Sequence, residues 1–137
     1  IPDFKLAKSH IDRRVEQLEE EGVIFHTEVH IGVDRSVSDI RDSYDAIILA
    51  GGSEIPRDLP IQGRNFNGIH YAMDFLTQQN RRNGKEVKSF SDEVLASGKD
   101  VVVIGGGDTG SDCIGTSIRQ GALSVTQLEI MPAPPEQ

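Results

Sequence analysis

The sequence has 137 residues, of which 36% are hydrophobic, with 14 glycines, six prolines and one cysteine. This composition is typical of a globular α/β protein and excludes collagenous and disordered chains, while the single cysteine excludes an intramolecular disulfide. The formal net charge of −8 argues against a nucleic-acid or anionic-membrane partner. The single cysteine and apolar runs too short to cross a bilayer lead us to expect a cytoplasmic protein.

The first part of the chain predicts one helix followed by extended structure. Apolar residues recur near a 3.6-residue period over residues 5–21, which predicts a helix with one buried stripe. Residues 23–31 alternate between apolar and other side chains and predict one strand or two short ones. The helical stripe consists of Leu6, Ile11, Val15 and Leu18.

The middle of the chain predicts two short helices and a buried strand. The spacing of Ser36 and Asp39 resembles a capping box and predicts a helical turn before Tyr44. Residues 44–50 form a short apolar run that two glycines stop, which is typical of a buried strand. A short helix is expected at 70–77, and the polar residues 78–98 predict a linker or surface excursion.

Residues 99–110 place a G-x-G-x-x-G motif directly after a β-branched strand. Gly105 permits the tight turn, Gly107 lets the backbone approach a pyrophosphate, and Gly110 lets a helix lie close to the strand. A helix that starts near Asp108 and Thr109 would direct free N–H groups and a positive dipole end at the anion. The motif therefore predicts a Rossmann dinucleotide site.

A second strand at 124–128 is followed by Glu129, which lies 19 residues after Gly110, where a ribose-binding acid belongs. The alternative is a solvated carboxylate at a strand end. Because a carboxylate repels a 2′-phosphate, and no Arg or Lys occurs between Gln127 and Gln137, we expect NADH to be preferred over NADPH.

Other polar residues near the motif indicate structural roles. Asp108 and Asp112 favour the helix dipole, and Asp108 suits a cap or turn. Cys113, one turn into the helix, is expected to be a buried small residue. A redox or nucleophilic role is disfavoured, because there is no second cysteine and no neighbouring histidine. We expect no metal site, because the single cysteine excludes a cysteine-rich one and the four histidines show no metal-ligand spacing. We also expect no catalytic acid, base or nucleophile, because in a dinucleotide enzyme the cofactors supply the chemistry and the protein positions them.

Residues 101–121, which read VVVIGGGDTGSDCIGTSIRQG, are followed by SVTQLEIMPAPPE. Together with IPDFKLAK, YDAIILAGG, PRDLPIQGR and GIHYAMDFLTQQN upstream, they resemble the flavin-containing small subunits (beta chains) of glutamate synthase. The resemblance covers nearly the whole chain, and several of its motifs are far more specific than G-x-G-x-x-G alone.

The resemblance implies an α/β fold in which Rossmann-like parallel sheets with flanking helices form an FAD domain and an inserted NAD(P)H domain. Residues 1–80 would be part of the FAD domain, 81–97 a linker, and 98–137 the start of the NAD(P)H domain. The cofactor-binding residues would be Gly105, Gly106, Gly107, Asp108, Thr109, Gly110 and Glu129 for NAD(P)H, and Ala50, Gly51 and Gly52 for the flavin. Among them, Gly106 is expected to add flexibility but no specificity.

The resemblance also implies an activity for the intact protein. Hydride would pass from NAD(P)H to FAD, and electrons would cross iron–sulfur clusters to a large subunit that makes glutamate from glutamine and 2-oxoglutarate. Iron–sulfur cysteines, the FAD domain's own glycine motif and further strands are missing here, so we expect an inactive internal fragment of a longer protein. The alternatives are a related NAD(P)H:FAD electron-transfer subunit for another partner, or an isolated non-catalytic nucleotide-binding fragment.

Overall fold

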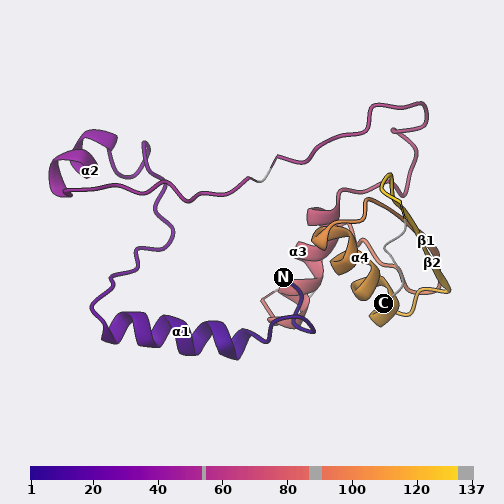
Figure 1. Ribbon diagram of the computed structural model, residues 1–137, viewed down its shortest axis with the longest axis horizontal. Coiled ribbons are helices and arrows are strands. Elements are labelled where there is room, and N and C mark those ends of the chain that lie inside the picture. The colour runs from indigo at the N-terminus through magenta and orange to yellow at the C-terminus, as the bar shows by residue number, and fades with distance from the viewer. Residues whose placement is uncertain (54, 87–90, 133–137) are drawn as a thin grey trace. The chain divides into compact units, whose positions relative to one another are not determined.

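The computed structural model describes residues 1–53, 55–86 and 91–132, and the chain divides into two compact units (Figure 1). One unit is Ser9–Ile55, and the other combines Ile1–Lys8 with Pro56–Gln137. None of the described helices is long and apolar enough to cross a membrane. In chain order the elements are α1 (Lys8–Glu20), α2 (Val37–Ser43), α3 (Ala72–Asn83), β1 (Asp100–Ile104), α4 (Asp108–Arg119) and β2 (Ser124–Leu128).

The unit Ser9–Ile55 contains most of α1 and all of α2. The predicted helical turn is confirmed as α2, and Ser36 is its N-cap, because Ser36 Oγ accepts a hydrogen bond from the backbone N–H of Asp39 at 3.0 Å. The helix predicted at 5–21 is confirmed as α1, but its buried stripe is wrong: no α1 residue is buried, and Ile11 is 42% exposed. Neither helix has a buried residue, so core packing contributes little to them, and α2 is stabilised by its N-cap.

Two strand predictions in this unit are wrong. Residues 23–31 contain no strand, only an isolated bridge between Ile31 and Arg35. Residues 44–50 are not a strand either, and Ile48 and Leu49 are 89% and 93% exposed. A strand needs a hydrogen-bonded neighbour, and among the described residues only β1 and β2 form a sheet. The apolar run at 44–50 has the pattern of a buried strand but no partner in this part of the chain.

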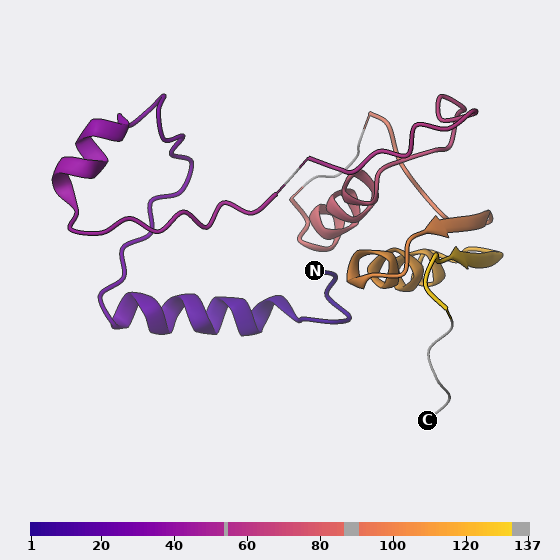
Figure 2. The same ribbon diagram turned by 45° about the horizontal axis from the view of Figure 1, so that its top comes forward.

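The second unit is built around a strand–helix–strand motif. β1 and β2 are parallel neighbours, with Val102 opposite Thr126, and α4 connects them and packs on both (Figure 2). A parallel pair requires a crossover connection, which the helix supplies. This arrangement confirms the predicted Rossmann-like α/β fold, and β2 has the predicted bounds.

The core of this unit lies where α3, α4 and β1 meet. It joins residues from both helices, from β1 and from the segment that leads into β1. Half-buried side chains extend this core on its edges, among them Val101, Ile114 and Val125. The buried core residues are Phe75, Leu76, Ala96, Val103 and Cys113.

α3 is longer than predicted. The expected helix at 70–77 runs instead from Ala72 to Asn83, through residues that we predicted to be linker. The predicted domain boundary after residue 80 falls within this helix, which packs against α4. Residues 87–90 of the predicted linker and 133–137 of the predicted NAD(P)H domain lie outside the described residues.

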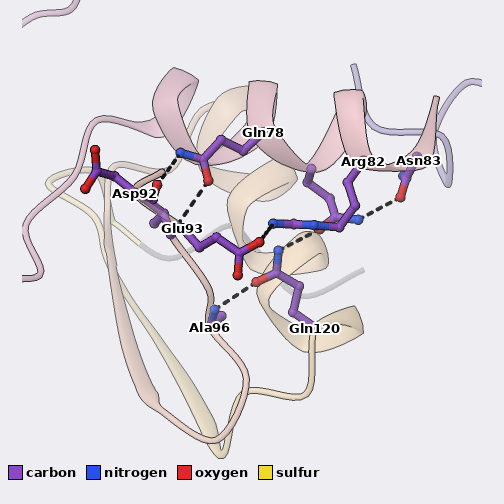
Figure 3. Close-up of polar contacts among 9 residues, drawn as sticks. Gln78, Arg82, Asn83, Asp92, Glu93, Ala96 and Gln120 are labelled. Atoms are coloured by element: carbon purple, nitrogen blue, oxygen red, sulfur yellow. Dashed lines mark hydrogen bonds and ion pairs between the residues drawn. The ribbon is translucent and has the colours of Figure 1, made fainter. Parts of the chain in front are cut away.

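The polar side chains of α3 hold the segment that enters β1 (Figure 3). Gln78 donates from Nε2 to the Asp92 carbonyl at 2.9 Å and accepts the Val94 N–H on Oε1 at 3.0 Å. Gln120, at the end of α4, accepts the Ala96 N–H at 2.8 Å and donates to Gln79 Oε1 at 2.8 Å. Residues just past the predicted end at 77 thus have specific partners: Gln78 pairs with backbone groups and Gln79 with a side chain of α4's end.

Replacing Gln120 with alanine should expose the consequence of this pairing. The variant removes the acceptor of the Ala96 N–H, and because Ala96 is buried, water cannot readily replace it. We therefore expect the amide hydrogen exchange of Ala96 to accelerate about tenfold. The measurement is residue-resolved hydrogen exchange on the intact protein. Gln17→Ala, which removes an amide from an exposed position on α1, should leave this exchange rate unchanged. Equal rates in Gln120→Ala and the parent protein would contradict the assigned bond.

Candidate dinucleotide-binding site

The turn after β1 has the geometry that the glycine motif predicts. Gly105 has a φ of +117°, a conformation that favours glycine. Its N–H donates to the Leu128 carbonyl at 2.9 Å, and its carbonyl accepts from Gln127 Nε2 at 3.0 Å. These two bonds fix the turn against the end of β2, so the backbone leaves the sheet in a defined direction.

The N-terminus of α4 follows this turn and is open. Gly107 is the N-cap and brings no side-chain cap, so the first N–H groups of the helix receive no bond from it. A Cβ built on Gly107 would meet no described heavy atom within 4 Å. Asp108 and Thr109, the first two helical residues, are exposed. Free N–H groups, a positive dipole end and open space suit an anion such as a pyrophosphate.

Gly110 brings α4 against the turn. A Cβ at this position would collide with the Gly105 carbonyl oxygen and lie 3.1 Å from the carbonyl carbon. Because this neighbour is backbone, it cannot rotate away as a side chain could. The close approach of helix and turn therefore requires glycine at position 110.

Glu129 lies beside the same turn, directly after β2. Its carboxylate accepts the N–H groups of Ile130 at 2.7 Å and Met131 at 3.1 Å. A Cβ on Gly106 would lie 2.5 Å from the Glu129 Cδ and 2.9 Å from its Cγ. We expected only flexibility from Gly106, but its missing side chain also leaves the space that the Glu129 carboxylate occupies.

The residues expected to approach the flavin belong to the other unit. Ala50, Gly51 and Gly52 are exposed, and Gly52 has a φ of +70° that favours glycine. The structure thus brings residues 105–110 together with Glu129 in one unit. Residues 50–52 belong to the unit Ser9–Ile55.

The structure also shows contacts of α4 that the sequence did not reveal. Asp112 is buried, and its carboxylate pairs with Lys5 Nζ at 2.5 Å. Phe4 packs on Gly115 beside this pair. We assigned Asp112 only to the helix dipole, and no local pattern links it to a residue more than 100 positions away.

Cys113 is confirmed as a buried small residue. Burial, together with the nearby Asp112 carboxylate, raises the pKa of this thiol from 9.0 to about 11. The thiolate fraction near neutral pH therefore falls about 100-fold, which opposes a nucleophilic or redox role.

This burial predicts that Cys113 is unreactive in the native protein. At pH 7.5 we expect iodoacetamide to label Cys113 in the native protein at least about 100-fold more slowly than in protein unfolded by guanidinium chloride. Mass spectrometry of the peptide that contains Cys113 measures both rates. Labelling of native protein at the unfolded rate would show that the thiol is accessible.

Known proteins resemble the chain over nearly its whole length. The family model for the pyridine nucleotide-disulphide oxidoreductases matches residues 5–136. A glutamate synthase (NADPH) small chain of Mycobacterium tuberculosis (strain ATCC 25618 / H37Rv) is 50% identical over 139 residues, which cover 99% of this chain and 28% of that protein.

Two further relatives widen the comparison. A glutamate synthase (NADPH) small chain of Bacillus subtilis (strain 168) is 47% identical over 131 residues, covering 93% of this chain and 26% of that protein. A glutamate synthase (NADH) of Schizosaccharomyces pombe is 45% identical over 139 residues, covering all of this chain and 7% of that protein. The chain thus spans little more than a quarter of the bacterial small chains, and the resemblance to them is confirmed. With a family match over residues 5–136 and a Rossmann-type unit within it, the chain belongs to the pyridine nucleotide-disulphide oxidoreductase family.

Proposed function

We propose that this chain is part of the electron-input small subunit of a glutamate synthase. The observation that carries the proposal is the α4 N-terminus: an uncapped helix start behind a glycine turn, with Glu129 beside it. The names of the relatives supply the reaction, since both bacterial small chains and a eukaryotic enzyme are glutamate synthases. In this proposal the subunit takes hydride from NAD(P)H onto FAD and passes electrons through iron–sulfur clusters to the large subunit or domain.

Residues of the second unit would hold the NAD(P)H. The pyrophosphate would lie at the N–H groups of residues 107–110, and the ribose hydroxyls would donate to Glu129. The nicotinamide supplies the hydride, and the chain's residues bind and orient the dinucleotide. Open space at Gly107 and the uncapped helix start both support an anion site there.

We further propose that NADH is preferred. The carboxylate of Glu129 accepts hydrogen bonds from hydroxyl groups but repels a 2′-phosphate. No Arg or Lys occurs from Gln127 to Gln137 to attract one. The relatives include proteins named for NADPH and for NADH, so their names do not decide between the two cofactors. The proposed preference for NADH is therefore argued from Glu129.

The domain assignment is part of the same proposal. Residues 1–80 would contribute to the FAD domain, with Ala50, Gly51 and Gly52 approaching the flavin, and 81–97 would link it to the NAD(P)H domain that starts at residue 98. A Cβ built on Gly51 or Gly52 would meet no described heavy atom within 4 Å, and this open space supports a flavin approaching there.

The test is glutamate formation by the intact protein with its large chain. We expect 2-oxoglutarate and glutamine to yield glutamate only when NADH or NADPH is supplied. Pyridine-nucleotide oxidation by the small chain with an artificial acceptor, but no glutamate with the large chain, would indicate an electron-transfer subunit for another partner. The isolated 137 residues can be titrated with NADH by calorimetry to test whether they bind it alone.

A further inference from the structure

The segment Ile1–Lys8 packs against α4, within the same compact unit. The Phe4 ring occupies the space over Gly115, where a Cβ would lie 2.5 Å from its Cζ. The Arg119 guanidinium lies over this ring, 3.7 Å from the ring centroid, and its Nη1 donates to the Gly115 carbonyl at 3.0 Å. A cation this close to an aromatic face stabilises the contact.

This anchor places Lys5 on a buried charge. Lys5 Nζ lies 2.5 Å from the Asp112 carboxylate, whose side chain is 12% exposed, against 35% for Lys5. A carboxylate this buried is costly without a cation beside it. Lys5 therefore neutralises a buried charge in the second turn of α4.

Asp112 lies close to the anion-binding end of α4. It is four residues after Asp108, the first residue of the helix, which places it about 6 Å along the helix axis. At this distance an unpaired carboxylate would repel a pyrophosphate at the helix start, and the low dielectric of a buried site would strengthen the repulsion. With Lys5 in place the pair is neutral, and the positive end of the helix dipole acts on the ligand.

We propose that Lys5 is an affinity-determining residue for the dinucleotide: it neutralises Asp112 beneath the pyrophosphate position without touching the ligand. The inference rests on the proposed function, because it requires a pyrophosphate at the α4 N-terminus. It assigns a role to a residue more than 100 positions from the glycine motif, on the segment that we propose to belong to the FAD domain.

Lys5→Met tests the inference, since it removes the charge and keeps an apolar stem. We expect the Kd for NADH to rise about three- to tenfold at low ionic strength, and this effect to shrink in 0.5 M NaCl. Asp112→Asn should lower the Kd or leave it unchanged, and the double variant should return it close to that of the parent protein. The measurement is a titration of the intact protein in the oxidised state, at pH 8 and two salt concentrations.

Lys8→Met is the matched control. Lys8 pairs with Asp3 at 3.3 Å in the same segment, and both side chains are about 40% exposed. This variant should leave the Kd unchanged. If Lys5→Met does not fold, Gly115→Ala displaces Phe4 while favouring the helix, and it should raise the Kd in the same salt-dependent way.

A purely structural ion pair gives a different pattern. In that case Lys5→Met and Asp112→Asn would both weaken NADH binding, equally at low and high salt, and this result would overturn the inference. An unchanged Kd in Lys5→Met would also overturn it. A parent protein that binds neither NADH nor NADPH would instead refute the proposed function, so the two failures are distinguishable.

Discussion

Replacing Gly110 with alanine should both destabilise the protein and abolish most of its NADH binding. The added methyl would collide with the Gly105 carbonyl, so α4 would have to move away from the turn. Overpacking of this kind costs about 1–3 kcal/mol of stability. We expect a Tm lower by several degrees and a Kd for NADH at least about tenfold higher, because the helix start would be displaced from the pyrophosphate. Thermal unfolding and calorimetric titration of the intact protein measure the two effects.

Gly107→Ala is the matched control for this prediction. A methyl at Gly107 meets no described atom within 4 Å, so stability should change by less than about 1 kcal/mol. The same methyl would occupy the space that we assign to the pyrophosphate, so the Kd should still rise. The two variants thus separate packing from binding. A Gly110→Ala protein with the parent Tm and Kd would refute the close approach of turn and helix.

Replacing Glu129 with arginine should reverse the cofactor preference. The variant loses an acceptor for the ribose hydroxyls and gains a cation that can pair with a 2′-phosphate. We expect the Kd for NADH to rise about tenfold and the ratio of NADPH to NADH affinity to rise about 100-fold. Titration of the oxidised intact protein with each dinucleotide measures this ratio.

Glu16→Arg is the charge-matched control for this reversal. Glu16 is an exposed residue of α1, and its replacement changes the net charge by the same amount. It should leave the ratio of NADPH to NADH affinity unchanged. A parent protein that binds NADPH more tightly than NADH would show that Glu129 does not select the cofactor.

The strand–turn–helix–strand unit could be predicted because its signals are local. β2 has the bounds that its apolar and β-branched residues indicate, and α4 begins within one residue of the expected start. Gly105 adopts the left-handed conformation that a tight turn after a strand demands. Each of these features depends on residues a few positions apart, so the pattern alone is sufficient.

Features that depend on distant partners could not be predicted. Residues 44–50 have the composition of a buried strand, yet Leu49 is 93% exposed, because a strand forms only beside a neighbour. The polar residues at the end of α3 indicated a linker, although Gln78 and Gln79 bond to other segments and extend the helix. A run of polar side chains indicates contact with solvent or with polar partners, and it is compatible with a helix.

The candidate site shows the same division. The glycine positions and Glu129 follow from motif spacing, and the structure places them at one turn. The contact of Glu129 with Gly106 and the pairing of Lys5 with Asp112 required the folded chain. Side chains brought together by tertiary packing leave no periodic trace in the sequence.

The visible absorption spectrum of the intact purified protein tests the central claim, that this chain belongs to an entry point for electrons from NAD(P)H. We predict flavin absorption bands that bleach when NADH is added anaerobically. A protein without flavin bands, or one whose flavin is not reduced by NADH or NADPH, would contradict the account.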